Sequence, residues 1–206
     1  MELRNDQKII LHLCADIGSD SKPYKESGYD VRCIGKDIGV ENYNPPENVY
    51  GIIANPPCTM FSIARTVSKT PRDLEEGMKL IKECLRIIWE CQYKTSLNKR
   101  VGCLKFWIIE NPATGMLKYF LGKPVFEYSP HEFGADFTKR TALWGWFTPP
   151  HKPFMQYLQL QKGNSVKDKM SITKYKGTFK ERREQQIHER STCYESFAKA
   201  FFEVNQ

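Results

Sequence analysis

Tyr50-Gly51-Ile52-Ile53-Ala54-Asn55-Pro56-Pro57-Cys58 is the stretch of the sequence that decides the fold. Its first five residues are almost all apolar, which is typical of a short buried strand. Proline has no amide hydrogen to donate to a neighbouring strand, so the strand must end before the two prolines. The cysteine that follows is therefore held in a tight turn at the end of a central strand.

Segments on either side of this strand alternate between strand and helix patterns. Strands are predicted at Ile9–Leu13, Asp30–Ile34, Leu104–Ile109 and Thr141–Phe147. A short helix is expected to end at Gly28, and an amphipathic helix is expected from Thr192 to Val204. This alternation predicts an α/β fold with a doubly wound, mainly parallel sheet and one late antiparallel strand.

The clearest helix is predicted from about Pro71 to Gln92. Thr70 can cap it, and Pro71 suits its first turn. Its apolar residues recur at helical spacing, at Leu74, Met78, Ile81, Leu85, Ile88 and Trp89. Cys84 and Cys91 lie near this apolar face, and we interpret them as core thiols.

The composition changes at Pro149-Pro150-His151-Lys152-Pro153, which predicts a boundary. Residues 161–190 hold nine Lys or Arg and four acids, whereas the whole chain has a net charge of +7. We therefore divide the chain into a core (1–148), a short basic segment that contacts the substrate (149–190) and a terminal helix that packs back on the core (191–206). The alternative is that 149–190 is a solvated loop without a specific role.

Several classes of protein are excluded by simple features. The seven cysteines are odd in number and none is spaced Cys-x-x-Cys, which argues against a disulfide framework or a structural zinc site. No signal peptide or membrane-spanning stretch is visible. We expect a reduced, cytoplasmic protein.

Reactive residue types lie at or just past the predicted strand ends, where ligands bind in such sheets. They are Asp16, Asp37, Cys58 and Glu110. Cys58 is held in an exposed turn, as a nucleophile requires, although most free cysteines are structural. Glu110 follows a strongly apolar strand, where a carboxylate needs a partner or a task. Taken alone, Glu110 is better explained as a helix cap or a salt-bridge partner than as a catalytic residue.

Four motifs occur in an order that resembles the cytosine-5 DNA methyltransferases, especially short versions from phage and bacterial genomes. They are Leu13-Cys14-Ala15-Asp16-Ile17-Gly18-Ser19, Pro56-Pro57-Cys58-Thr59-Met60-Phe61-Ser62, Glu110-Asn111-Pro112 and Thr138-Lys139-Arg140-Thr141. In that family the second motif holds the nucleophile, the third a glutamate and the fourth an arginine. The resemblance covers most of the chain, from Ile9 to about Phe147.

The resemblance implies a function and a site. Cys58 would add to carbon 6 of cytosine, Glu110 would face N3 and the amine, and Arg140 would hold the carbonyl at position 2. S-adenosylmethionine would be the cofactor and DNA the partner, in the cytoplasm of a bacterial or phage-infected cell. The residues implied in cofactor binding are Ala15, Asp16, Ile17, Gly18, Asp37, Ile38, Asn55 and Pro56.

The chain also departs from the family pattern. His12 stands where the family usually has an aspartate, Asp16 where it has a glycine, and Thr138 where it has a glutamine. The large domain that recognises the target sequence is missing, and residues 149–190 stand in its place.

Two other functions stay open. Asn55-Pro56-Pro57 is similar to the loop with which amino methyltransferases grip an exocyclic amine, although Cys58 stands where they have an aromatic residue. A degenerate methyltransferase fold that only binds nucleic acid or protein is the third possibility, supported by His12 and Asp16.

Overall fold

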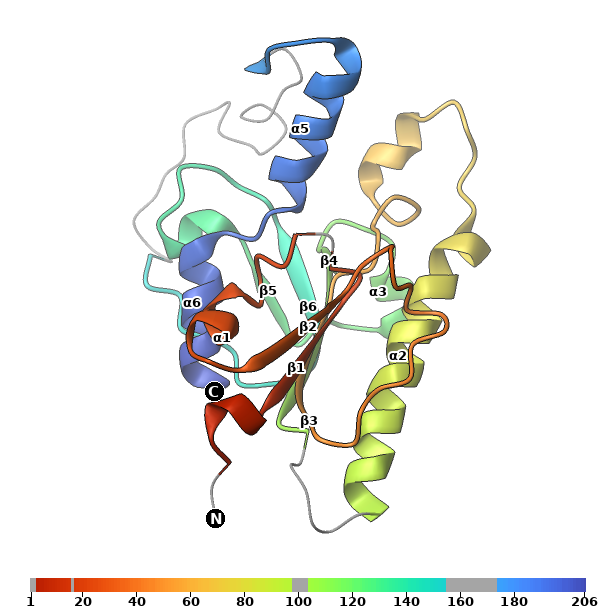
Figure 1. Cartoon of the computed structure of the whole chain (residues 1–206). Coiled ribbons are helices and arrows are strands. Elements are labelled where there is room, and N and C mark those ends of the chain that lie inside the picture. The colour runs from red at the N-terminus through yellow and green to blue at the C-terminus, as the bar shows by residue number, and fades with distance from the viewer. Residues whose placement is uncertain (1–2, 16, 98–103, 155–173) are drawn as a thin grey trace.

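A computed structural model of the chain describes residues 3–15, 17–97, 104–154 and 174–206 (Figure 1). Six strands form one sheet in the order β2-β1-β3-β4-β6-β5. The strands are β1 (Ile9–Leu13), β2 (Asp30–Ile34), β3 (Val49–Ala54), β4 (Phe106–Pro112), β5 (Phe126–Tyr128) and β6 (Thr141–Trp146). Strands β1 to β4 are parallel, β6 is antiparallel to β4, and β5 is antiparallel to β6. The predicted α/β fold with a mainly parallel sheet and late antiparallel pairing is confirmed.

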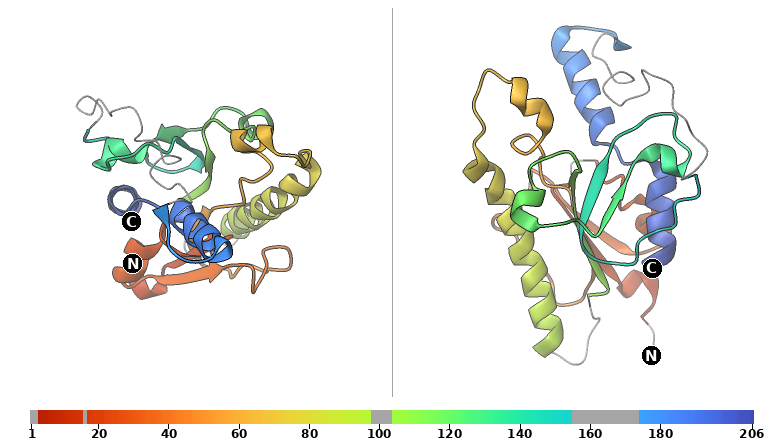
Figure 2. Two further views of the ribbon diagram at one scale, coloured as in Figure 1. Left: turned by 90° about the horizontal axis from the view of Figure 1, so that it is seen from above. Right: turned by 180° about the vertical axis from the view of Figure 1, so that it is seen from behind.

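Helices cover both faces of the sheet (Figures 1 and 2). Helix α2 (Leu74–Leu97) covers one face, where Ile81, Cys84 and Ile88 pack against Leu11, Leu13, Ile52 and Ile109. Helices α1 (Lys22–Glu26) and α6 (Glu195–Val204) cover the other face, where Tyr24, Phe197 and Phe201 pack against Ile10, Ile53 and Ile108. Alternate residues of each strand therefore serve two cores, which explains why the strands are apolar throughout.

Strand β4 is longer than the sequence indicated. It was expected to end at Ile109, but it continues to Pro112, because β6 pairs with it as far as Pro112↔Thr141. Glu110 and Asn111 therefore lie within the strand rather than beyond its end. The three-residue strand β5 was not predicted.

Helix α2 begins later than predicted, at Leu74. The Asp73 carboxylate accepts the Glu76 backbone N–H at 2.8 Å, so Asp73 caps the helix in place of Thr70. Cys84 and Cys91 are buried, in agreement with their interpretation as core thiols, but Trp89 is 66% exposed and does not belong to the buried face.

Smaller elements complete the described residues. They are the 3-10 helices η1 (Asn5–Gln7), η2 (Ile63–Val67) and η3 (Pro130–Phe133), and the helices α3 (Lys118–Leu121) and α5 (Phe179–Ser191). Helix α5 belongs to the basic segment and rises beyond the carboxyl ends of the parallel strands (Figure 1). The final helix, α6, starts at Glu195 rather than Thr192. Within the described ranges, no helix is long and apolar enough to cross a membrane.

Candidate active site

Strand register places a row of polar side chains on the α6 face of the sheet, near the carboxyl ends. Ile53 and Ile108 belong to the core on this face, so Asn55 and Glu110, two residues further along, point the same way. His12 is paired with Ile53 and shares the face. Polar groups from β1, β3 and β4 therefore meet in one place.

The turn that carries Cys58 is fixed to its neighbours by hydrogen bonds. Fully buried Asn111 donates from Nδ2 to the Pro56 carbonyl oxygen at 3.1 Å. The Cys58 carbonyl oxygen accepts the backbone N–H groups of Phe61 and Ser62 at 3.0 and 2.7 Å. These bonds hold the half-buried Cys58 side chain beside the end of β4.

Cys58, Glu110 and Lys139 interact electrostatically. Burial raises the pKa of the Cys58 thiol, the charge of Glu110 raises it further, and the charge of Lys139 lowers it. The pKa of Glu110 is raised to about 7, chiefly by burial, while Lys139 lowers it and Asp20 raises it. The Glu110 residue is partly accessible to solvent, but the burial of its carboxyl group has the largest effect on its pKa. At neutral pH this carboxyl group is therefore divided between its acid and its anion.

Arg140, predicted as the cation of the site, is not brought to Cys58 and Glu110. Its guanidinium lies 2.9 Å from the carboxylate of Glu127, and its side chain is 64% exposed. Alternation along β6 explains this, since Ala142 belongs to the α2 face and Arg140 shares its parity. Lys139 is adjacent to Arg140, so its side chain points to the opposite face of the sheet, the face of Glu110. Counting back from Thr141 identifies Lys139 only once the face of Thr141 is known, and that face is set by the pairing of β6 with β4.

A cavity of about 160 Å³ lies at the carboxyl ends of β1 and β2, next to the turn that carries Cys58. Its lining residues are Cys14, Ile34, Gly35, Lys36, Gly39, Val40, Glu41, Pro57 and Leu80. Cys14 adopts a left-handed backbone conformation (φ 56°) that is rare for residues other than glycine. The end of β1 is therefore bent sharply where the cavity begins.

Among the described residues, none of those predicted to bind the cofactor lines this cavity. The Ala15 N–H donates to the Ile34 carbonyl oxygen at 3.2 Å, Ile17 is exposed, and Gly18 has a φ of 73°. Asp37 and Ile38 are exposed and do not line the cavity, although Lys36 and Gly39 on either side of them do. Pro57 lines it rather than Asn55 or Pro56. Asp16 lies outside the described residues.

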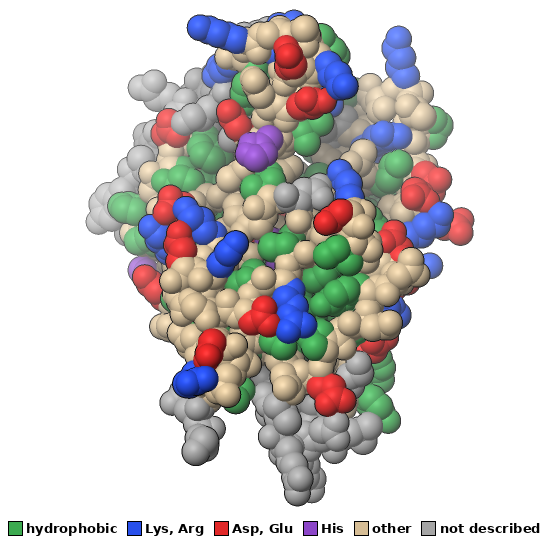
Figure 3. Space-filling model, viewed as in Figure 1, with side chains coloured by type: hydrophobic (Ala, Val, Ile, Leu, Met, Phe, Trp, Pro, Cys, Tyr) green, Lys and Arg blue, Asp and Glu red, His purple; other side chains and the backbone are tan. Residues whose placement is uncertain are grey.

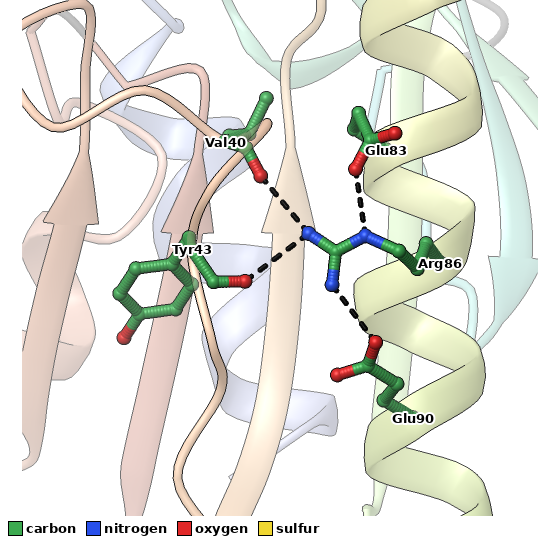
Figure 4. A network of polar contacts seen from close by, with 5 residues as sticks. All are labelled: Val40, Tyr43, Glu83, Arg86 and Glu90. Carbon is green, nitrogen blue, oxygen red and sulfur yellow. Dashed lines mark hydrogen bonds and ion pairs between the residues drawn. The ribbon is translucent and has the colours of Figure 1, made fainter.

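Arg86 holds the outer wall of the cavity in place (Figure 4). From α2, its Nη2 donates to the carbonyl oxygens of Val40 and Tyr43 at 3.2 and 3.1 Å. Its other donors bind Glu83 at 2.6 Å and Glu90 at 2.8 Å. All three nitrogens of one guanidinium thus tie the loop after β2 to helix α2, and Val40 in that loop lines the cavity.

His12 joins β1 to the start of the turn that carries Cys58. Its Nδ1 lies 2.8 Å from Ser21 Oγ and its Nε2 lies 3.0 Å from Asn55 Oδ1, while Asn55 Nδ2 donates to Asp20 at 3.3 Å. Burial lowers the pKa of His12 more than Asp20 raises it. The histidine that departs from the family pattern therefore has a clear structural task, which is to orient Asn55.

Sequence reasoning also missed Asp20 and Cys193 as neighbours of the site. Burial, followed by the charge of Asp20, raises the pKa of Cys193 well above its usual value. The Cys193 N–H donates to Ser19 Oγ at 2.9 Å, which ties the start of α6 to the loop after β1. No sequence pattern signals a contact between segments this far apart.

Within the described residues, no group of three or more His, Cys, Asp or Glu side chains could hold a metal ion. No protein-family model matches the chain, and no curated protein matches it.

Proposed function

We propose that this chain is an S-adenosylmethionine-dependent methyltransferase that modifies carbon 5 of cytosine in DNA through a covalent bond to Cys58. The observation that carries the proposal is the meeting of Cys58, Glu110 and Lys139, together with a Glu110 pKa of about 7. A carboxyl group with that pKa can both donate and accept a proton near neutral pH. A cysteine, a proton donor and a cation are the groups that activation of a cytosine ring requires.

The proposed reaction uses these residues in turn. Lys139 favours the Cys58 thiolate, which forms a bond to carbon 6 of the cytosine ring. Protonated Glu110 donates its proton to N3, so the ring becomes an enamine that is nucleophilic at carbon 5. After methylation, carbon 5 loses its proton to solvent, N3 returns its proton to Glu110, and the bond to Cys58 breaks. The thiolate is released unchanged.

The lining of the cavity next to the Cys58 turn supports binding of the nucleoside part of the cofactor there. Ile34, Val40 and Leu80 offer apolar walls suited to a purine ring, and Glu41 offers a carboxylate suited to hydroxyl or amino donors. S-adenosylmethionine, when bound, supplies the methyl group. Pro57 lines the cavity and precedes Cys58, so the nucleophile turn lies between the cavity and the Glu110 side chain. The sheet order, with its antiparallel β6, supports a methyltransferase fold of the Rossmann-like kind.

The contacts of Asn55 disfavour an amino methyltransferase. Such an enzyme needs the side-chain amide of this residue to receive the exocyclic amine. Here Asn55 Oδ1 is held by His12 and Asn55 Nδ2 is directed to Asp20. The cytosine-5 reaction does not need this amide to receive an amine, because its nucleophile is the thiol of Cys58, which follows Pro56 and Pro57.

Trapping with 5-fluorocytosine DNA tests the proposal. Fluorine replaces the proton that must leave carbon 5, so the adduct should persist as a covalent protein–DNA complex. Cys58→Ser should abolish trapping, because a hydroxyl group supplies almost no anion at neutral pH. Cys33→Ser, at an exposed cysteine, is the matched control and should trap normally. Methyl transfer by Cys58→Ser, or a methyl group on an exocyclic nitrogen, contradicts the mechanism. Calorimetry that detects no binding of S-adenosylmethionine points to a degenerate, binding-only fold.

A further inference from the structure

Two cysteine thiols lie in contact beside the cavity at the carboxyl ends of β1 and β2. Cys14 Sγ lies 3.9 Å from Cys84 Sγ, and both residues carry thiols in the structure. Cys14 follows β1 and lines the cavity, whereas Cys84 lies in the middle of α2 and is fully buried. Residues 70 positions apart in the chain are therefore brought together at the wall of the cavity.

The geometry of this contact suits a disulfide. A disulfide bond is about 2.0 Å long, so each sulfur atom has to move by only about 1 Å to form one. The strand pairing of β1 ends at Leu13, so Cys14 lies outside the hydrogen-bonded ladder. Its left-handed backbone conformation (φ 56°) is strained, and strained residues gather at functional sites. Cys14 is therefore the thiol whose backbone is placed to adjust.

Access to solvent separates the roles of the two thiols. Cys14 is half-buried and borders the cavity, so a small reagent reaches it first. The hydrogen bond to Cys14, followed by burial, raises the pKa of Cys84 well above its usual value. Cys84 therefore stays protonated near neutral pH. Once Cys14 has reacted, this hydrogen bond is lost, and with it the largest cause of the raised pKa of Cys84.

The cavity determines which reagent reaches Cys14. Its volume of about 160 Å³ holds a few molecules the size of water, but not a bulky oxidant such as a tripeptide disulfide. Its outer wall is the loop after β2, which lies at the surface on the side of the molecule seen in Figure 3. Ile34, Val40 and Leu80 make much of the lining apolar, which favours an uncharged reagent. A small hydroperoxide meets both conditions.

We propose that Cys14 and Cys84 are a redox modification site, at which hydrogen peroxide converts the two thiols into a disulfide. The Cys14 sulfur attacks one peroxide oxygen and the O–O bond breaks, which leaves a sulfenic acid at Cys14 and, with the Cys14 proton, one water. The Cys84 sulfur then attacks the Cys14 sulfur and the S–O bond breaks, so that hydroxide leaves with the Cys84 proton as a second water. The two sulfur atoms are oxidised and the peroxide is reduced.

The disulfide alters the cavity because Cys84 belongs to a fixed part of its wall. Leu80, one turn before Cys84 on α2, lines the cavity, and Arg86, two residues after it, bonds the loop that carries Val40. The movement therefore falls mainly on Cys14, whose side chain borders the cavity. The effect on cofactor binding rests on the proposed function, because it requires S-adenosylmethionine to occupy this cavity.

Mass spectrometry tests the modification site without reference to methyl transfer. Hydrogen peroxide should link the tryptic peptides 9–25 and 83–86, each of which contains one cysteine, and a reductant should separate them. Cys84→Ala should abolish the link and leave a sulfenic acid at Cys14 that dimedone traps. Cys91→Ala, at another buried cysteine of α2, is the matched control and should still form the link. The absence of the linked peptides from the oxidised, unsubstituted protein overturns the proposal.

Calorimetry separates the modification site from the proposed function. In Cys58→Ser, where peroxide cannot oxidise the nucleophile, the disulfide should weaken binding of S-adenosylmethionine on the order of tenfold, and reduction should restore it. Bound cofactor should slow formation of the linked peptides, because it covers Cys14. Equal affinities of the oxidised and reduced forms overturn the effect on the cavity. If the reduced protein binds no S-adenosylmethionine but the link forms, the proposed function fails and the modification site stands.

Discussion

The side-chain amide of Asn111 donates to the Pro56 carbonyl oxygen at 3.1 Å, and this bond joins the end of β4 to the turn that carries Cys58. Asn111 is fully buried, so the bond is shielded from water. We expect Asn111→Ala to lower the free energy of unfolding by about 1–3 kcal/mol, because a buried carbonyl loses its donor. Urea unfolding measures this, with Asn48→Ala at an exposed position as the control. An unfolding free energy equal to that of the control means that the turn does not depend on β4.

The raised pKa of Glu110 predicts how stability depends on pH. Because the folded protein holds this proton up to a pKa of about 7, against an ordinary value of 4.5, the favourable contribution is complete below pH 4.5 and is lost as pH rises to about 7. The loss is on the order of 3 kcal/mol. Glu110→Gln should remove this part of the pH dependence and unfold at a higher temperature than the unsubstituted protein at pH 8.

Glu127→Gln is the control for that comparison, because Glu127 is exposed and paired with Arg140. It should keep the pH dependence between pH 4.5 and 7. If Glu110→Gln unfolds at a lower temperature than the unsubstituted protein at pH 8, burial does not raise the pKa of Glu110.

Lys139 and Arg140 form a natural pair of variants. The charge of Lys139 lowers the pKa of Cys58, whereas Arg140 binds Glu127 on the other face of the sheet. Lys139→Met should therefore raise the Cys58 pKa and slow its alkylation by iodoacetamide at pH 8, while Arg140→Met should leave the rate within about twofold. Mass spectrometry of the Cys58 peptide measures the rates. A larger effect of Arg140→Met would return the role of the cation to Arg140.

Asp37 provides a test of the cofactor site. Asp37→Ala should weaken S-adenosylmethionine binding by about 1–3 kcal/mol if its carboxylate receives the ribose hydroxyls. Calorimetry measures the affinity, and Asp30→Ala is the control because Asp30 begins β2, at its far end from Asp37, and pairs with Arg32. Since Asp37 does not line the cavity, unchanged affinity in Asp37→Ala moves the ribose to another group, with Glu41 the first to substitute.

Local pattern was sufficient to predict the first three strands. Each of β1, β2 and β3 is a short run bounded by turn residues, and their observed bounds match the predicted ones to within one residue. Strand β4 was misjudged because its last three residues are strand only through pairing with β6, thirty residues later in the chain. Helix α2 was recognised by its apolar spacing, but its first residue depends on which side chain captures the free amides, and that is Asp73.

The site was predicted less completely than the fold, because it too depends on contacts between segments that are distant in the chain. Cys58 and Glu110 could be chosen because each comes just after a conspicuous apolar run in the sequence. Lys139 and Arg140 are adjacent in sequence and similar in charge, and only the parity of β6 separates them. Asp20 and Cys193 approach Glu110 because α1 and α6 fold onto the same face of the sheet, which no local pattern encodes.

Asn205 accepts the Thr148 backbone N–H at 2.8 Å and donates to the Thr148 carbonyl oxygen at 2.9 Å, so the end of α6 is bonded to the end of β6. The same helix brings Phe197 and Phe201 onto the sheet. During translation, the strands therefore emerge long before the helix that shields them. The nascent chain holds an uncovered apolar surface until residue 205 has left the ribosome, and in that interval it is a candidate client for chaperones.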